Sequence, residues 1–173
     1  MSEFDKEIQA LETVKEMLID RGYTLEEDSK EDFIVKGRTS KHTIICFICK
    51  EEKLSIQGIK EFVSLMNKEN YTKCIIVYRD SYTSSAKKSL DIMEYNIELF
   101  SINELQFNIT KHILVPKHEK VPKKEKEELE KKYKARLPII LHTDPVCRYY
   151  QFQRGDYIQI TRKNGSIIYR IVK

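Results

Sequence analysis

The stretch that decides the fold of the C-terminal part of the chain is Leu137-Pro-Ile-Ile-Leu-His-Thr-Asp-Pro-Val-Cys-Arg-Tyr-Tyr150. Asp144 followed by Pro145 predicts the start of a helix. An Asp side chain caps free backbone N–H groups, and proline fits the first helical position because it has no N–H to leave unpaired. The apolar run 137–141 before the cap predicts a buried strand. A strand followed directly by a capped helix is therefore expected here.

A hairpin is predicted at the end of the chain. Two strand-like runs, 157–162 and 167–172, are separated by a turn that contains Asn164-Gly165. Asn-Gly between two such runs is the strongest short-range hairpin signal, because both residues tolerate positive φ. Together with the strand and the helix before it, the hairpin predicts a small α+β module.

The N-terminal part of the chain alternates between helical and strand-like patterns. Apolar residues at helical spacing predict helices, and short continuous apolar runs predict strands buried on both faces. The expected elements are, in order, a helix over 3–20, strands over 33–38 and 43–49, a helix over 56–69, a strand over 74–78, a helix capped by Ser84 or Ser85, and a strand over 97–100. This order predicts a three-layer α/β unit of about 105 residues.

Charge is distributed unevenly along the chain. Residues 1–110 hold 15 Lys and Arg against 20 Asp and Glu, a balance of −5, whereas residues 111–173 hold 16 against 7, a balance of +9. The split indicates either two solvated faces or a basic module that docks on an acidic partner or near nucleic acid. Between the two parts, a Pro-containing connector leads into a charged helix over 123–134. We expect an N-terminal domain over 1–107, a linker with a charged helix over 108–136, and a C-terminal domain over 137–173.

The cysteines and the hydropathy pattern limit the class of protein. Cys46 and Cys49 form a C-x-x-C pair, but an odd spacing in a strand points two side chains to opposite faces, and no second pair completes a zinc site. Buried structural thiols are therefore expected. No apolar run is long enough for a membrane span, and the N-terminus lacks the apolar region of a signal peptide. We expect an intracellular protein.

Several multi-residue motifs point to one family. The pattern LP-I-x-x-x-DPV-x-RYY-x-x-x-RGD, closing on YRIV, resembles the C-terminal domain of the fifth subunit shared by eukaryotic RNA polymerases, a domain that also has an archaeal counterpart. The stretches 58–63, 66–70, 75–77, 83–90 and 108–118 resemble the same eukaryotic subunit. The resemblance implies a restriction-endonuclease-like N-terminal "jaw" without an active site, and a C-terminal assembly module.

The resemblance also implies a function and its partners. The chain is expected to be a non-catalytic structural subunit that anchors to the largest polymerase subunit and flanks downstream duplex DNA through phosphates, without sequence specificity. No cofactor is expected. The expected location is the nucleus, or a virion or cytoplasmic virus factory for a viral version. Two departures from the family are Ser84, where the family has proline, and the short turn 162–166, where the family has a longer loop.

Five residues form the candidate DNA contact. A helix N-terminus exposes free N–H groups that favour phosphate, and two lysines in the first turns add positive charge. The residues are Thr83, Ser84, Ser85, Lys87 and Lys88. The alternative interpretation is an ordinary capped helix.

Six residues form the candidate subunit interface: Asp144, Pro145, Arg148, Tyr149, Tyr150 and Arg154. Arg and Tyr are enriched at the energetically important centres of protein interfaces. In the alternative interpretation the tyrosines fill the core and Arg148 pairs with a carboxylate.

Two other functions remain open: a nuclease-fold enzyme and a dissociable adaptor that binds the polymerase. Metal-dependent cleavage of DNA needs clustered carboxylates and usually a nearby lysine. Lys50 has the place of that lysine, but the metal-binding position two residues before it is Ile48, and Asp32 lacks its acidic partner. We therefore expect no catalytic and no metal-binding residues.

Overall fold

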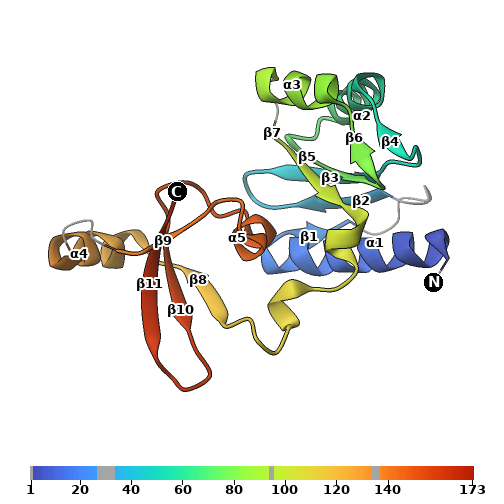
Figure 1. Ribbon diagram of the computed structural model, residues 1–173. Helices are drawn as coiled ribbons and strands as arrows, with labels where there is room; N and C mark the ends of the chain where they lie inside the picture. Colours follow the sequence, from blue (N-terminus) through green and yellow to red (C-terminus); the bar gives the residue numbers. More distant parts are fainter. Residues whose placement is uncertain (1, 27–33, 94–95, 134–136) are drawn as a thin grey trace. The chain divides into compact units, whose positions relative to one another are not determined.

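The structure is a computed structural model that describes residues 2–26, 34–93, 96–133 and 137–173. It divides into two compact units, Met1–Phe107 and Asn108–Lys173 (Figure 1). Asp32 lies outside the described residues. No helix in the described part of the chain is both long and apolar enough to cross a membrane.

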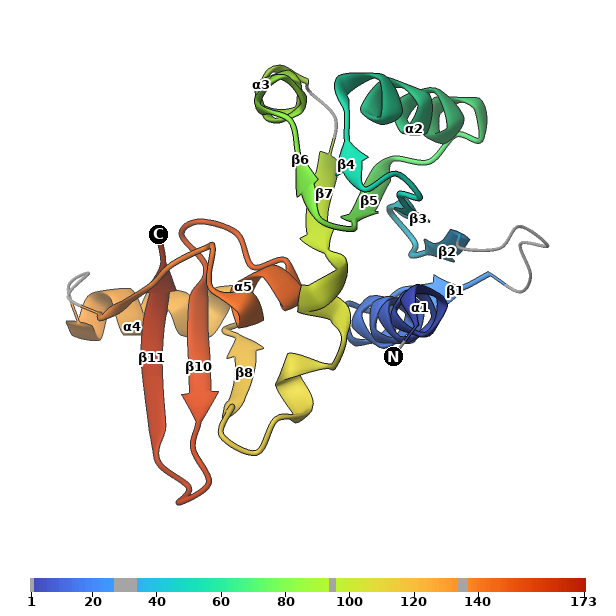
Figure 2. The ribbon, with the colours of Figure 1, turned by 45° about the vertical axis from the view of Figure 1, so that its right-hand side comes forward.

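The first unit is built on a five-stranded sheet with the order β1-β2-β3-β5-β7. Strands β1 to β3 are antiparallel neighbours, whereas β3, β5 and β7 run parallel. Helix α1 lies on one side of this sheet, and α2 and α3 lie on the other (Figures 1 and 2). The elements are α1 (Glu3–Asp20), β1 (Thr24–Leu25), β2 (Ile34–Arg38), β3 (Thr43–Ile48), α2 (Ile56–Lys68), β5 (Lys73–Tyr78), α3 (Ser84–Ile92), β7 (Asn96–Ser101) and the 3-10 helix η1 (Ile102–Leu105).

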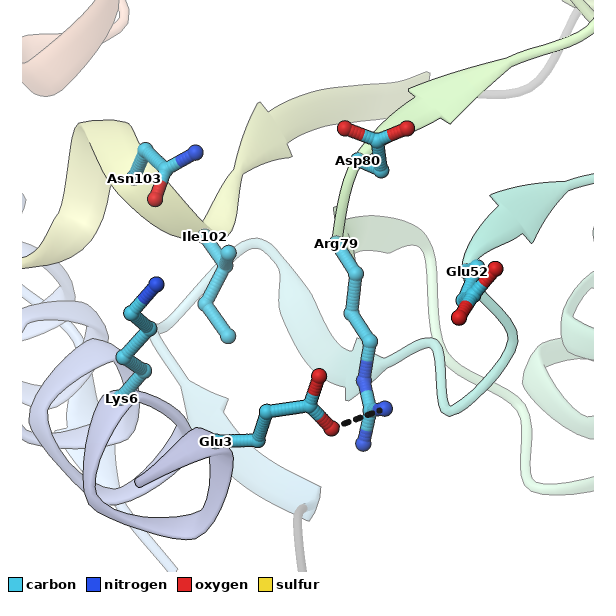
Figure 3. A pocket seen from close by; sticks show the side chains of 7 residues that line it. All are labelled: Glu3, Lys6, Glu52, Arg79, Asp80, Ile102 and Asn103. Carbon is cyan, nitrogen blue, oxygen red and sulfur yellow. Dashed lines mark hydrogen bonds and ion pairs between the residues drawn. The ribbon is translucent and has the colours of Figure 1, made fainter. Parts of the chain in front are cut away.

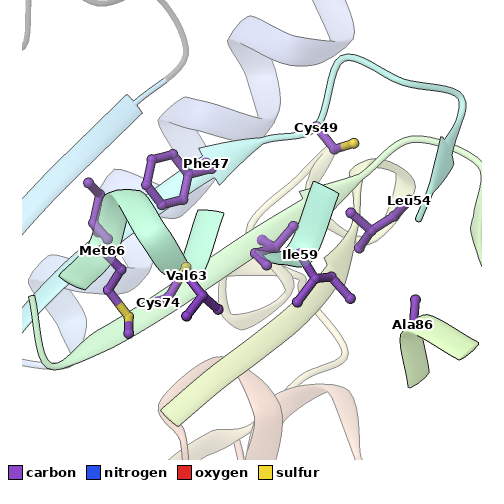
Figure 4. Close-up of a cluster of buried hydrophobic side chains, with 10 residues drawn as sticks. Phe47, Cys49, Leu54, Ile59, Val63, Met66, Cys74 and Ala86 are labelled. Carbon is purple, nitrogen blue, oxygen red and sulfur yellow. The ribbon is translucent and has the colours of Figure 1, made fainter. Parts of the chain in front are cut away.

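The predicted three-layer arrangement follows from the burial pattern of these elements. Five of the six residues of β3 are buried, because helices cover both faces of the central strands. Helix α2 places Ile59, Val63 and Met66 at helical spacing against the sheet (Figure 4). Phe47 of β3 stacks on Phe62 of α2 with ring centroids 5.0 Å apart. Full burial of an aliphatic side chain such as Ile59 contributes about 1.5–3 kcal/mol to stability.

Helix α1 has sequence-encoded ends. Ser2 and Asp5 form a capping box, in which each side chain accepts a backbone N–H of the other. At the other end Gly22 has φ +84°, a left-handed conformation that glycine adopts without strain. The predicted helix over 3–20 is thus confirmed at both ends.

The second unit contains a four-stranded sheet with the order β8-β10-β11-β9. The predicted hairpin is present: β10 and β11 are antiparallel, Thr161 pairs with Ile167, and Gly165 in the turn has φ +80°. The elements of this unit are the 3-10 helix η2 (Ile109–Lys111), β8 (Lys117–Lys120), α4 (Lys123–Tyr133), β9 (Ile139–Ile140), α5 (Pro145–Tyr150), β10 (Tyr157–Thr161) and β11 (Ile167–Val172).

The prediction of a buried strand over 137–141 is confirmed only in part. Only Ile139–Ile140 forms a strand, and it lies at the sheet edge, parallel to β11. Ile140 faces the core, whereas Ile139 and Leu141 are 52% and 56% exposed. An edge strand has one strand neighbour, and Pro138 has no backbone N–H to extend the pairing.

The segment 108–136, expected as a linker with a charged helix, contributes to the second unit. Strand β8 pairs antiparallel with β10. Val121 and Leu129 are buried against Tyr157, and Lys126 lies over the Tyr157 ring at 5.1 Å. The polar residues of β8 carry no apolar alternation, which is why the sequence does not predict this strand.

The four cysteines, Cys46, Cys49, Cys74 and Cys147, are free and buried, as expected. Burial raises the pKa of Cys74 to about 12 and that of Cys147 to about 11, and it also raises the pKa values of Cys46 and Cys49. A thiol with a raised pKa is a poor nucleophile and a poor metal ligand at neutral pH.

Candidate functional site

The candidate DNA contact lies at the N-terminus of α3. Thr83 is the N-cap, and its side-chain oxygen accepts the Ala86 N–H at 3.1 Å. The sequence-based expectation of Ser84 or Ser85 as the cap is wrong, because Thr83 is the last residue with an extended backbone and its hydroxyl reaches the third helical N–H. The Ser85 hydroxyl lies 3.0 Å from the Thr83 hydroxyl.

The structure brings all five candidate DNA-contact residues into the first two turns of this helix. Ser84, Ser85, Lys87 and Lys88 are exposed, and Thr83 is half-buried. Ala86 fixes the helix on the core with a fully buried side chain. The end of α3 therefore presents backbone N–H groups, hydroxyls and two ammonium groups on one exposed surface.

The chain holds this surface in place with Ser84, and not a proline, at the first helical position. The Thr83 N–H donates to the Leu54 carbonyl at 3.1 Å. Just before it, the short strand β6 (Ser81–Tyr82) pairs with β4 (Lys53–Leu54), and the Tyr82 ring packs edge-on against Tyr78. Backbone pairing and aromatic packing fix the position of the loop.

The candidate subunit interface is centred on α5. Asp144 Oδ1 accepts the Val146 N–H at 2.9 Å, and Pro145 occupies the first turn, so the predicted helix start is confirmed. The helix ends at Gln151, which has a left-handed backbone with φ +56°. A short helix capped at both ends is a rigid mount for its side chains.

The six interface residues differ in exposure. Pro145 and Arg154 are exposed, and Asp144, Arg148 and Tyr150 are half-buried. Tyr149 is only 3% exposed. The tyrosines of the motif are thus divided between a core position and a partly accessible one. The Tyr150 ring lies edge-on to Tyr149 at 5.1 Å and stacks on Phe152 at 5.3 Å.

Asn108 is a residue whose importance the sequence did not reveal. It is 8% exposed, and its Nδ2 donates to the Tyr149 hydroxyl at 2.7 Å. Its Oδ1 accepts both the backbone N–H and the hydroxyl of Thr110, at 3.0 and 2.6 Å. The local signal for the cap was present, because Asn followed two residues later by Thr is typical of a side chain that turns back on its own backbone.

Arg154 and His142 form a polar pair near the end of the chain. His142 Nδ1 lies 3.1 Å from the Lys173 carbonyl oxygen. A carbonyl oxygen only accepts hydrogen bonds, so in this contact Nδ1 is the donor and carries a hydrogen. Its Nε2 lies 3.1 Å from the Arg154 guanidinium and accepts from it. A neutral imidazole satisfies both contacts.

A polar cavity of about 380 Å³ lies in the first unit, beyond the carboxyl ends of β3, β5 and β7 (Figure 3). In open α/β sheets this edge is the usual place for ligands. Here Arg79 occupies it as an ion-pair partner: its guanidinium bonds to Glu3 at 3.1 Å and to the buried Glu7. The Arg79 charge is thus engaged by two carboxylates of its own unit. The lining residues are Glu3, Lys6, Glu52, Arg79, Asp80, Ile102 and Asn103.

The position that would bind metal in a nuclease is apolar. Ile48 is the last residue of β3 and is 5% exposed, and Lys50 follows two residues later. An isoleucine offers no oxygen to a metal ion. Among the described residues, no group of three or more His, Cys, Asp or Glu side chains is arranged to hold a metal ion.

Family comparisons match both units. Residues 107–172 match the family described as RNA polymerase Rpb5, C-terminal domain. Residues 7–107 match the family described as restriction endonuclease, in agreement with the layered fold of the first unit. The solved structure of MspJI restriction endonuclease in complex with an oligonucleotide overlaps 58% of this chain and 26% of its own, with 18% identity and a TM-score of 0.39, which is too low to bear on function.

Relatives match over nearly the whole chain. The subunit RPABC1 of DNA-directed RNA polymerases I, II, and III from Caenorhabditis briggsae is 34% identical over 176 residues, which cover 95% of this chain and 83% of the relative. The corresponding rpabc1 subunit of Dictyostelium discoideum is 33% identical over 195 residues and covers 99% of both chains. Subunit 5B of RNA polymerases IV and V from Arabidopsis thaliana is 28% identical over 191 residues, 94% of this chain and 88% of the relative.

A nuclease-type fold with an apolar metal position, followed by a polymerase-subunit domain, defines a non-catalytic polymerase subunit rather than a free-standing nuclease. The chain belongs to the Rpb5 family, the fifth subunit of DNA-directed RNA polymerases, also named RPABC1. Its role is therefore in transcription.

Proposed function

We propose that the second unit anchors this chain to the largest subunit of its polymerase, while the first unit flanks downstream duplex DNA. The observation that carries the anchoring role is the fold of the DPVCRYY motif. It forms a helix, α5, with caps at both ends. Its Arg148 and Tyr150 stay partly accessible while Tyr149 is buried.

The accessible surface of α5 and of the loop that follows it suits a protein partner. Pro145, Arg148, Tyr150 and Arg154 combine aromatic area with guanidinium groups, the residue types most enriched at interface hot spots. Helix α5 is capped at both ends and holds Pro145, Arg148 and Tyr150 in place, so little conformational entropy is lost on binding. The second unit has a balance of +9, which favours an acidic surface on the partner.

The DNA-flanking role is supported by the end of α3. Two backbone N–H groups and two lysines can contact two or three phosphates, which position DNA without reading its sequence. The first unit has a net charge of −5, so these few contacts give little affinity in the free chain. We therefore infer that the contact operates only when the assembled polymerase holds the DNA nearby.

The proposed location is the nucleus, because the relatives are subunits of eukaryotic RNA polymerases. The proposed partners are the largest subunit, other polymerase subunits and downstream DNA.

Co-purification with the largest subunit tests the proposal. Residues 108–173 should be retained on it through washes at about 0.5–1 M salt, whereas residues 1–107 should not. Circular dichroism should first establish that each fragment is folded. Retention of the N-terminal fragment alone would reverse the assigned roles. Loss of the full chain at moderate salt would instead favour the dissociable adaptor, because a contact dominated by exposed charges is screened under those conditions.

A further inference from the structure

A loop with two highly exposed aliphatic side chains lies between η2 and β8. Ile113 and Leu114 are adjacent in sequence and are 69% and 82% exposed. The loop leads into the start of β8 in the lower part of the second unit (Figures 1 and 2). Large apolar side chains that protrude together from a soluble protein are typical of contact sites.

The backbone of this loop is held by its own hydrogen bonds. The Val115 N–H donates to the His112 carbonyl at 2.9 Å, and the Leu114 N–H donates to His112 Nδ1 at 3.2 Å. The Lys111 N–H donates to the Asn108 carbonyl at 3.0 Å. Ile113 and Leu114 are thus presented on a closed turn, which is unlike an extended linker.

The base of the loop is tied to α5. Asn108 is buried at the start of η2, and its Oδ1 accepts the Thr110 backbone N–H. Its Nδ2 donates a hydrogen bond to the Tyr149 hydroxyl at 2.7 Å. Tyr149 lies between Arg148 and Tyr150, two partly accessible residues of α5. The exposed tip of the loop, Ile113 and Leu114, is therefore connected through Asn108 to α5, whose surface we propose contacts the largest subunit.

We propose that Ile113 and Leu114 form an anchor that inserts into an apolar, acid-rimmed pocket of the largest polymerase subunit. The inference rests on the proposed function and names the part of the second unit that enters the partner. The closed turn orders the two side chains before binding, so their desolvation contributes to affinity with little loss of entropy. The balance of +9 over residues 111–173 favours carboxylates around the pocket.

Tyr149 acts as a positioning residue in this arrangement. Its side chain is buried, so it holds the loop through Asn108 and has no direct route to the partner. This explains how a tyrosine of the interface motif serves assembly from within the core.

The test replaces the tip in the full chain. Ile113→Ser combined with Leu114→Ser should lower affinity for the largest subunit by about tenfold or more, as expected for hot-spot residues, with the melting temperature unchanged. The matched control is Ile92→Ser on α3, where the side chain is 81% exposed, and it should bind like wild type. Wild-type affinity of the tip variant overturns the inference. So does a clear fall in its melting temperature, because the tip would then pack within its own chain.

A double-mutant cycle tests the positioning role. Tyr149→Phe alone should weaken binding, but it should add little once the tip has been replaced, because the two act as one unit. Fully additive losses would show that Tyr149 acts elsewhere and would refute the link. If the wild-type chain itself fails to bind the largest subunit, the proposed function fails, which is distinct from a tip variant that binds as well as wild type.

Discussion

Arg21 and Glu98 form a two-pronged ion pair that joins the end of α1 to β7. Nη1 of Arg21 lies 2.8 Å from Oε1 of Glu98, and Nη2 lies 2.9 Å from Oε2. The arginine side chain is 3% exposed and the glutamate side chain 21%. A guanidinium matches a carboxylate in this parallel geometry, which makes the bonds strong and directional. Because the arginine is buried, water cannot take the place of the carboxylate.

Removing one partner of this pair should destabilise the first unit strongly. Glu98→Ala removes both carboxylate bonds of the buried Arg21 guanidinium, so the free energy of unfolding should fall by about 3 kcal/mol. Arg21→Met combined with Glu98→Leu should lose less, because no charge stays buried. The control is Glu12→Ala at the exposed Glu12–Lys15 pair, which should change stability by less than about 1 kcal/mol. Urea unfolding followed by circular dichroism gives all three values, and equal losses at both pairs would contradict the argument.

Local patterns predicted most elements of the first unit. Helix α1 and strand β5 carry their signals in neighbouring residues, as helical apolar spacing, a cap, or a continuous apolar run. The Arg21–Glu98 pair was not predictable, because its members are 77 residues apart and only the folded sheet brings them together. Strand β8 is polar and forms through pairing with β10, so its sequence carries no strand signal.

The candidate sites show the same division. The Asp144 cap was predictable because the bond it makes spans two residues. The sequence could not predict that Tyr149 is buried while Tyr150 stays partly accessible. Consecutive helical residues point in different directions, and the tertiary packing decides which one faces the core. The bond from Asn108 to Tyr149 spans 41 residues and was likewise hidden.

The Asp144 cap is expected to contribute to the stability of the second unit. Asp144→Ala should lower the stability of the second unit by about 1 kcal/mol, and Asp144→Asn by much less, since asparagine also caps.

Arg148→Ala should reduce retention on the largest subunit more than it reduces stability, because its side chain is partly accessible. Thermal melts beside pull-down yields decide this. A large melting shift with unchanged retention would identify Arg148 as a core residue.

Glu26 gives the first unit a defined response to acid. Burial by itself raises the pKa of Glu26, but the hydrogen bond from the Tyr71 hydroxyl at 2.8 Å and the Arg38 contact lower it below the usual value of 4.5. A carboxyl with a lowered folded-state pKa stabilises the fold above its unfolded pKa, and this stabilisation disappears as pH falls. Tyr71→Phe should therefore lower the free energy of unfolding at pH 7 and have a smaller effect near pH 3. Urea unfolding at both pH values measures the difference, and an effect equal at both would argue against a role for the Glu26 charge.

The end of α3 makes a quantitative prediction for the assembled polymerase. Each phosphate neutralised by a lysine contributes about −0.9 to the slope of log affinity against log salt. Lys87→Glu combined with Lys88→Glu should therefore weaken downstream-duplex binding and flatten that slope by about 2 at most, equally for all DNA sequences, because phosphate contacts carry no sequence information.

The matched control is Lys123→Glu combined with Lys124→Glu, which makes the same charge change on two adjacent exposed lysines at the start of α4. It should leave the salt slope at the wild-type value if the contact belongs to α3. The free chain should bind duplex DNA weakly or undetectably, since its first unit is net acidic. Ser84→Pro should preserve the wild-type slope because proline fits the first helical position. An unchanged slope in the Lys87 and Lys88 variant would show that this helix end is a structural cap alone.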